Sequence, residues 1–410
     1  MRPVLRLNKM LAGLAALTDE PGKLTRTFLS PAMRRANARV GRWMREAGLN
    51  VREDPTGNLI GRLESSVRGA KTLVLGSHLD TVRDAGRYDG ALGVLLPIVA
   101  IAELRRRDVA LPFAVEVVGF SEEEGVRFSS AYLGSKGYAG RLRATDLALR
   151  DADGVSVREA LERFNRRKFV LSRAAHRRSE LLGYFEVHIE QGPVLEAEKL
   201  AVGVVSAIAG QTRVRLTFRG KAGHAGTTPM ALRRDALAGA AEFIGAAESL
   251  ARASVPLVAT VGTVAVAPGA ANVIPGEATI SLDVRHPRDD ARRGALRILR
   301  ASAKHIAQRR KLALAWQATQ DNGAVACSPA LTALLAGSIA AVQGRNAALV
   351  SGAGHDAVVL SALTPVAMLF VRCRDGLSHH PDEHASPADL GVALRVTIDF
   401  IEGLARARSP

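Results

Sequence analysis

Segments made mostly of hydrophobic residues occur at 72–76, 113–120 and 184–189, and they are separated by longer segments of mixed character. Short unbroken apolar runs are typical of strands that are buried on both faces of a sheet. The segment 91–107, which lies between the first two runs, has the composition of a helix. Strands that alternate with helices predict an α/β sheet with helices on both faces.

The N-terminal part of the chain predicts helices and two short strands. Residues 1–17 are basic and then apolar, with polar interruptions, which indicates an amphipathic helix rather than a signal peptide. A hydroxyl residue before Pro31 begins a second helix, and this helix is expected to end near Gly48. Short strands are expected at 49–52 and 58–63.

The pattern changes near Gly210 from continuous apolar runs to alternation, which is typical of a half-exposed strand. The following elements are expected at 212–218, 231–252, 257–266, 277–285, 289–309 and 311–317. This β-α-β-β-α-β order predicts a small antiparallel sheet with two helices on one face, as in ferredoxin-like α+β domains. Because apolar strands such as 365–371 return afterwards, we predict an inserted domain at 210–322 within a larger domain made of 1–209 and 323–410.

The composition of the chain indicates what fills its core and which classes of protein are not expected. The chain has 410 residues, of which 47% are apolar and only 4% aromatic, so aliphatic side chains must fill the core. Its length suggests about two domains. Two cysteines, Cys327 and Cys373, do not make a disulfide framework in a chain of this length. Since no segment reaches the roughly 18 uninterrupted apolar residues of a membrane span, we expect a soluble, cytoplasmic protein without a membrane partner.

The formal net charge of +16 has two interpretations. One is an arginine-rich, solvated surface, and the other is attraction of an anion, either a small acidic substrate or nucleic acid. The basic residues form short groups such as 105–107 and 166–168, and few aromatic residues interleave with them. This pattern does not favour a nucleic-acid groove, and we expect no nucleic-acid partner. A non-catalytic basic binding protein remains a remote alternative.

Candidate chemistry is concentrated where apolar strands end, which is where ligands bind in open α/β sheets. Five segments carry acidic or imidazole side chains, namely 76–81, 86–90, 120–125, 186–192 and 378–381. A single histidine beside a strand is usually a core or surface residue, so the argument depends on the joint pattern. The three adjacent acids at 122–124 repel one another unless a cation lies nearby. A ligand set of nitrogen and oxygen atoms without thiolates suits Zn²⁺, Mn²⁺ or Co²⁺.

These segments resemble the metallopeptidase-like amidohydrolases and, among them, the hydantoinase/carbamoylase family, which includes allantoate amidohydrolases, N-carbamoyl-L-amino-acid hydrolases and β-ureidopropionases. The matching segments are GSHLDTVRDAGRYDGALGV (76–94), SEEEGVRF (121–128), HIEQGPVLE (188–196), GKAGHAGTTPM (220–230), ANVIPGEATISLDVRHP (271–287), SGAGHDA (351–357) and DGLSHHPDE (375–383). The resemblance implies a mixed-sheet catalytic domain of the zinc-exopeptidase type with an inserted dimerisation or lid domain. In aminoacylase and dipeptidase relatives a carboxylate usually stands where His188 stands here.

The resemblance also implies a centre with two divalent metal ions per subunit, zinc or manganese, with cobalt as a further option. Asp89 would bridge the two ions. His78 and His188 would complete the protein ligands of one ion, and Glu124 and His379 those of the other.

Further roles near the metal centre follow from the same resemblance. Asp80 would orient the imidazole two residues before it, and Glu123 would be the general base. Glu122 has no implied role and is expected to face solvent. His379, rather than His380, matches the family's Ser-His-x-Pro pattern.

Binding of a carboxylate substrate would involve the inserted domain as well. The resemblance implies that His224 stabilises the oxyanion across a dimer interface, and therefore that the protein is a homodimer. A bidentate arginine suits a carboxylate. The residues implied in substrate binding, besides His224, are Gln191, Asn272, Arg285, Gly354 and His355.

The identity of the substrate depends on finer similarities. Segments 82–88 and 368–374 resemble allantoate amidohydrolases more than carbamoylases, which favours hydrolysis of allantoate to ureidoglycine, ammonia and carbon dioxide. An N-carbamoyl-L-amino-acid hydrolase or a β-ureidopropionase is the alternative. The chain departs from its relatives at Lys136, where they usually carry arginine.

Overall fold

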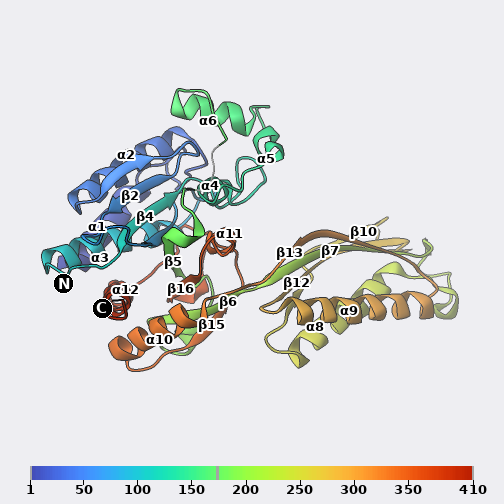
Figure 1. The fold of residues 1–410 in the computed structure, drawn as a ribbon. Helices are drawn as coiled ribbons and strands as arrows, with labels where there is room; N and C mark the ends of the chain where they lie inside the picture. The colour runs from blue at the N-terminus through green and yellow to red at the C-terminus, as the bar shows by residue number, and fades with distance from the viewer. Residues whose placement is uncertain (1, 172–174, 409–410) are drawn as a thin grey trace. The chain divides into compact units, whose positions relative to one another are not determined.

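A computed structural model describes residues 2–171 and 175–408 (Figure 1). The chain divides into two compact units. One contains the residues up to Ser206 together with those from Cys327 onward, and the other is Ala207–Ala326. The range predicted for the inserted domain, 210–322, lies within this second unit.

A mixed sheet of nine strands forms among the described residues, in the order β1-β2-β4-β3-β5-β16-β6-β14, with β15 also paired to β6. The strands are β1 (Asn50–Glu53), β2 (Leu59–Leu63), β3 (Thr72–His78), β4 (Ala114–Phe120), β5 (Leu181–Ile189), β6 (Val202–Ile208), β14 (Val325–Ala326), β15 (Ala348–Ser351) and β16 (Val366–Val371). The predicted α/β class with a mixed sheet is thereby confirmed.

The four central strands of this sheet, β4, β3, β5 and β16, are parallel. Every residue of β3, β4 and β16 is buried, as their mostly apolar sequences predict. Antiparallel β2 joins β4 on one side, and antiparallel β6 joins β16 on the other. The carboxyl ends of four neighbouring strands therefore meet at one edge of the sheet.

The helices of the first unit, which contains the residues up to Ser206 and those from Cys327 onward, pack largely around α3. The residues of α3 are buried on nearly all sides. Helices α1, α2 and α12 contact α3, and α10 contacts α12. The helices are α1 (Arg2–Ala15), α2 (Pro31–Glu46), α3 (Ala91–Arg106), α4 (Leu133–Tyr138), α5 (Ala144–Ala148), α6 (Val157–Asn165), α7 (Val194–Ala197), α10 (Pro329–Gln343), α11 (Ala357–Leu360) and α12 (Pro387–Arg406), with 3₁₀ turns at Arg178–Glu180 and Arg374–Gly376. Among the described residues, none of the helices combines the length and the apolar composition needed to cross a bilayer.

The second unit has an antiparallel sheet in the order β10-β12-β7-β13, and β9 also pairs with β12. Its elements are β7 (Gly210–Arg219), β8 (Gly223–His224), a 3₁₀ turn (Met230–Leu232), α8 (Ala236–Ala253), β9 (Val258–Thr260), β10 (Val264–Ala267), β11 (Val273–Ile274), β12 (Glu277–His286), α9 (Asp289–Arg309) and β13 (Ala313–Asn322). Helices α8 and α9 pack together on one face of the sheet (Figure 1). The strand predicted at 257–266 is instead two strands, separated around Gly262, a residue type that weakens strands.

Candidate metal centre and active site

The candidate site lies at the edge where the four parallel strands of the large sheet end. His78 is the last residue of β3, and His188 is the penultimate residue of β5. The acids 122–124 follow β4, and His379 lies in the loop after β16. Because β3 lies between β4 and β5 in the sheet, segments far apart in the sequence deliver their side chains to one place.

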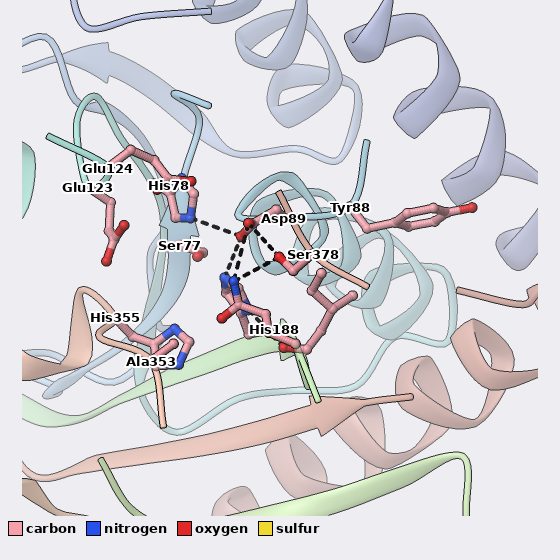
Figure 2. Close-up of polar contacts among 12 residues, drawn as sticks. Ser77, His78, Tyr88, Asp89, Glu123, Glu124, His188, Ala353, His355 and Ser378 are labelled. Carbon is pink, nitrogen blue, oxygen red and sulfur yellow. Dashed lines mark hydrogen bonds and ion pairs between the residues drawn. The ribbon is translucent and has the colours of Figure 1, made fainter. Parts of the chain in front are cut away.

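Asp89 lies at the centre of this group (Figure 2). Its Oδ1 is 3.0 Å from Nε2 of His188 and 3.5 Å from Nε2 of His78. Its Oδ2 is 3.2 Å from Nε2 of His379, which in turn lies 3.7 Å from Oε1 of Glu124. The two oxygens of one carboxylate thus face two different sets of ligand atoms.

The structure brings together all five residues that the sequence predicts as metal ligands. His78, Asp89 and His188 offer three ligand atoms within 4.8 Å of one another, and so do Asp89, Glu124 and His379. The two groups share Asp89 and contain only nitrogen and oxygen donors. This arrangement fits a pair of divalent cations of the zinc or manganese type.

The electrostatics of the buried acids also fit a cation site. Burial, together with the charges of Asp89 and Asp80, raises the pKa of Glu124 to about 7. Burial and the charge of Glu124 raise the pKa of Glu123 well above its usual range. Both carboxylates are therefore costly to ionise within the protein alone, and a bound cation offsets that cost.

Each histidine on the central strands is oriented by an acceptor at its second ring nitrogen. Nδ1 of His188 is 2.9 Å from the carbonyl oxygen of Ile189. Nδ1 of His78 is 3.0 Å from the carbonyl oxygen of Asp80 and 3.4 Å from the Asp80 carboxylate. A carbonyl oxygen only accepts hydrogen bonds, so each ring carries a proton on Nδ1, and Nε2 is the ring nitrogen that would bind a cation at the centre.

Asp80 has a second set of contacts that the sequence did not indicate. Its carboxylate accepts hydrogen bonds from the backbone N–H groups of Glu123, at 3.0 Å, and Glu124, at 3.2 Å. It therefore joins the histidine on β3 to the acidic segment after β4. At the other side of His78, a side chain at Gly90 would collide with the imidazole ring, so the residue after Asp89 must be glycine.

The prediction that Glu122 faces solvent is wrong. Its side chain is buried, and its carboxylate accepts hydrogen bonds from the backbone N–H groups of Gly125 and, at 2.9 Å, Leu133. A buried loop must satisfy its backbone N–H groups internally, and Glu122 does so for the segment that carries the two acids beside the centre.

Glu383 and Ser378 are further site residues to which the sequence assigned no role. The buried carboxylate of Glu383 accepts hydrogen bonds from the backbone N–H groups of Tyr88, at 2.8 Å, and Asp89, at 3.1 Å. The Ser378 hydroxyl donates to Oδ2 of Asp89 at 3.1 Å. Together they fix the main chain and the carboxylate of Asp89. Their only signal in the sequence is membership of the matched segment 375–383.

The two adjacent histidines after β16 have different surroundings. His379 adopts a φ of 57°, a left-handed conformation that is uncommon outside glycine. This conformation turns its ring to Asp89 and Glu124, whereas Nδ1 of His380 lies 3.8 Å from Asp382. The structure therefore places His379, and not His380, at the centre.

Gln191, predicted to bind substrate, also contacts the centre. Its amide Nε2 donates to Oδ2 of Asp89 at 3.3 Å and to the Ser378 hydroxyl at 2.9 Å. Since a carboxylate oxygen only accepts hydrogen bonds, these contacts define which end of the amide is the nitrogen.

His355 and Gly354, the other predicted binding residues of this unit, support the site from within the protein. His355 is buried, with Nε2 2.7 Å from the Ser351 hydroxyl, and its ring centroid lies 4.5 Å from that of His188. It therefore packs against a candidate ligand (Figure 2). A side chain at Gly354 would collide with the hydroxyl of Tyr132.

Within the second unit, His224 and Asn272 lie beside each other. His224 is in β8, which pairs with β11 opposite Val273, and the N–H of Ala225 donates to the carbonyl oxygen of Asn272 at 2.9 Å. Both residues lie beyond the end of the sheet at which β7 ends and β12 begins with Glu277.

Arg285 lies toward the opposite end of the same sheet. It is eight positions along β12 from Glu277, which at the rise of a strand corresponds to about 26 Å. Its guanidinium contacts the Asp283 carboxylate through Nε, at 2.9 Å, and Nη2, at 3.1 Å. One copy of this unit therefore holds His224 and Arg285 far apart.

Comparison with known proteins agrees with the matched segments. The family model described as peptidase family M20/M25/M40 matches residues 74–403. The chain is 40% identical to an allantoate deiminase of Arabidopsis thaliana, over 95% of this chain and 80% of that protein. It is 38% identical to an N-carbamoyl-L-amino acid amidohydrolase of Geobacillus stearothermophilus, over 98% of both proteins.

A solved structure gives the same result for the fold. An amidase of the hydantoinase/carbamoylase family from Burkholderia multivorans aligns with a TM-score of 0.92 and 34% identity, over 99% of this chain and 98% of that one. The resemblance inferred from the sequence is confirmed. The chain belongs to the M20/M25/M40 peptidase family, and it is a metal-dependent amidohydrolase of the hydantoinase/carbamoylase type that acts on C–N bonds.

Proposed function

We propose that the protein hydrolyses a ureido C–N bond of a small carboxylate, with allantoate as substrate and ureidoglycine, ammonia and carbon dioxide as products. The observation that carries the proposal is the Asp89 carboxylate, which belongs to two groups of candidate ligands beside Glu123. Substrates of the carbamoyl amino acid type remain the second candidate, because a relative with that name aligns over 98% of both proteins.

Two divalent cations fit the ligand set. His78, Asp89 and His188 would hold one, and Asp89, Glu124 and His379 would hold the other. Nitrogen and oxygen ligands suit zinc or manganese, with cobalt as a further option. When bound, such a pair supplies Lewis-acid chemistry, which polarises a carbonyl group and lowers the pKa of water.

Glu123 is positioned to move the proton. Its carboxylate lies with His78 and Glu124 in a group whose ligand atoms are within 4.8 Å of one another. In the proposed reaction Glu123 takes a proton from water as the water oxygen bonds to the ureido carbon, and it delivers that proton to the departing nitrogen. Ammonia leaves as the C–N bond breaks, and the N-carboxy product loses carbon dioxide.

Gln191 is suited to a ureido group. Its Oε1 is buried and accepts no hydrogen bond from the described residues, while its Nε2 donates to Asp89 and Ser378. A buried acceptor without a partner is costly. If the side chain moved so as to expose this oxygen, the N–H groups of a ureido substrate would satisfy it, and on this basis we propose Gln191 as a partner of the ureido group.

The second unit supports a homodimeric site. A substrate the size of allantoate is far shorter than the separation of His224 from Arg285 within one unit. If both residues bind the same substrate, they come from different chains. We therefore propose that Arg285 of one chain and His224, with Asn272, of a second chain hold one substrate molecule.

Mixing two inactive variants tests this arrangement. His224→Ala and Arg285→Ala are each expected to have little activity, and mixing them with subunit exchange is expected to restore it. Random exchange gives mixed dimers with one complete site of two, hence about one quarter of the wild-type activity. Steady-state rates before and after exchange provide the measurement. A mixture that stays inactive, with mixed dimers present, contradicts the two-chain site.

A substrate panel tests the choice of allantoate. Chelated protein is reconstituted with Zn²⁺ or Mn²⁺, and ammonia release from allantoate is compared with hydrolysis of N-carbamoyl-L-amino acids and ureidopropionate. We expect kcat/KM to be highest for allantoate. Faster turnover of a carbamoyl amino acid would reject allantoate while leaving the metal centre intact. No turnover of any member would remove the whole proposal.

A further inference from the structure

A buried arginine, Arg26, lies against the loop that joins two of the candidate ligands. Its side chain is 1% exposed, in the segment between α1 and α2. The guanidinium Nε donates to the carbonyl oxygen of Leu79 at 2.6 Å, and Nη1 donates to those of Leu14, at 3.1 Å, and Leu17, at 3.0 Å. The Arg26 guanidinium thus connects the C-terminal end of α1 to the residue that follows His78.

The main chain around Arg26 holds the same loop. The N–H of Thr81 donates to the carbonyl oxygen of Arg26, whose own N–H donates to the Thr81 hydroxyl, both at 2.9 Å. The N–H of Ala85 donates to the carbonyl oxygen of Leu24 at 2.8 Å. The loop from residue 79 to 88, which sets where Asp89 lies relative to His78, is therefore tied to this segment.

The charge of Arg26 is costly where it lies. Burial lowers its pKa to about 10, against the opposing charges of Asp80 and Asp19. A guanidinium out of water is stabilised only by well-placed acceptors and counter-charges. The carbonyl groups of Leu79, Leu14 and Leu17 supply the acceptors, and Asp80, which also contacts His78 and the backbone of Glu123, supplies a counter-charge.

We propose that Arg26 is a positioning residue for the metal centre. By holding the carbonyl group between His78 and Asp80, it sets the orientation of that histidine and its placement relative to Asp89. It also places a positive charge near the carboxylate that links His78 to the acidic loop. The inference rests on the proposed two-metal function, and Arg26 itself touches neither cation nor substrate.

Cobalt binding provides the test, with chelator competition for affinity and the visible spectrum of the Co²⁺-loaded protein for ligand geometry. Arg26→Gln is expected to lower the affinity at the site of His78 by about tenfold to 100-fold, the usual range for a residue that supports a ligand. Its cobalt spectrum is expected to change. Arg26→Lys keeps the charge but loses the separate Nε and Nη1 donors of the guanidinium. Its cobalt affinity is expected to lie between those of Arg26→Gln and the wild type.

The matched control is Arg292→Gln, because Arg292 is equally buried but lies in the second unit, where it contacts Asp289, Thr212 and Asp321. This variant is expected to lose stability and to keep wild-type cobalt affinity and spectrum. If folded Arg26→Gln does the same, the proposal is overturned. If Arg26→Gln does not fold, cobalt affinity and a spectrum like those of the wild type in Arg26→Lys overturn the proposal. The proposal is also overturned if neither variant folds. Absence of Co²⁺ binding by the wild type would instead reject the two-metal function.

Discussion

Glu123→Gln is expected to keep its bound cations and to lose turnover by about 10²-fold to 10⁴-fold, the range that general acid–base catalysis contributes. The glutamine side chain has nearly the same size, so it preserves the loop but cannot accept a proton from water. Glu123 is placed for this role beside His78 and Glu124, and its backbone N–H is held by Asp80. Single-turnover kinetics with a metal-replete preparation, together with metal analysis, measure the two effects separately.

The neighbouring acid provides the control. Glu122→Gln changes a carboxylate one residue away whose partners are the backbone N–H groups of Gly125 and Leu133. Each N–H group bonds to a different carboxylate oxygen, and a glutamine retains only one acceptor oxygen, so we expect a lower free energy of unfolding. We expect kcat to stay within a few-fold of wild type, because neither group of candidate ligands around Asp89 includes this side chain. Normal turnover in Glu123→Gln, or equal losses in both variants, would reassign the base.

Asp89→Asn is expected to lose both cations, whereas His379→Ala is expected to lose one. The wild type is expected to bind about two divalent ions per chain, as two-metal hydrolases do. Asp89 belongs to both ligand groups, and its replacement by a neutral amide removes the shared negative charge; His379 belongs to one group only. Metal analysis after dialysis against a weak chelator gives the stoichiometry, and activity is expected to fall to background in Asp89→Asn.

His380→Ala is the natural comparison for His379→Ala. The two side chains are adjacent and equally exposed, at 50% and 49%, but only His379 faces Asp89. His380→Ala should therefore retain about two ions and wild-type turnover. Loss of an ion from this variant would exchange the roles of the two histidines, and two ions in Asp89→Asn would show that the carboxylate is not shared.

The sequence predicted the large sheet and the grouping of the candidate ligands because both depend on local patterns. Buried parallel strands are typically made mostly of apolar residues, and the strands β3, β4 and β16 fit this pattern. Since parallel strands end at one edge, His78 and the acids that follow β4 could be expected to meet.

Residues that act through distant backbone groups could not be predicted in this way. Glu383 accepts a hydrogen bond from the backbone N–H of Tyr88, which is 295 positions away. Arg26 donates one to the backbone carbonyl of Leu79, which is 53 positions away. Nothing near either residue in the sequence indicates the backbone group that it meets. Glu122 was misjudged for the same reason, because an acid after a strand has the same local pattern whether it faces water or buried N–H groups.

The bonds from Glu383 to the segment around Asp89 have a consequence for synthesis of the protein. A chain emerging from the ribosome exposes its N-terminal strands first. His78, Asp89, Glu124 and His188 are all made within the first half of the chain, but the residues that fix Asp89, Ser378 and Glu383, come near its end. A nascent chain therefore has four of the candidate ligands before it has the fifth, His379, and the two residues that fix Asp89.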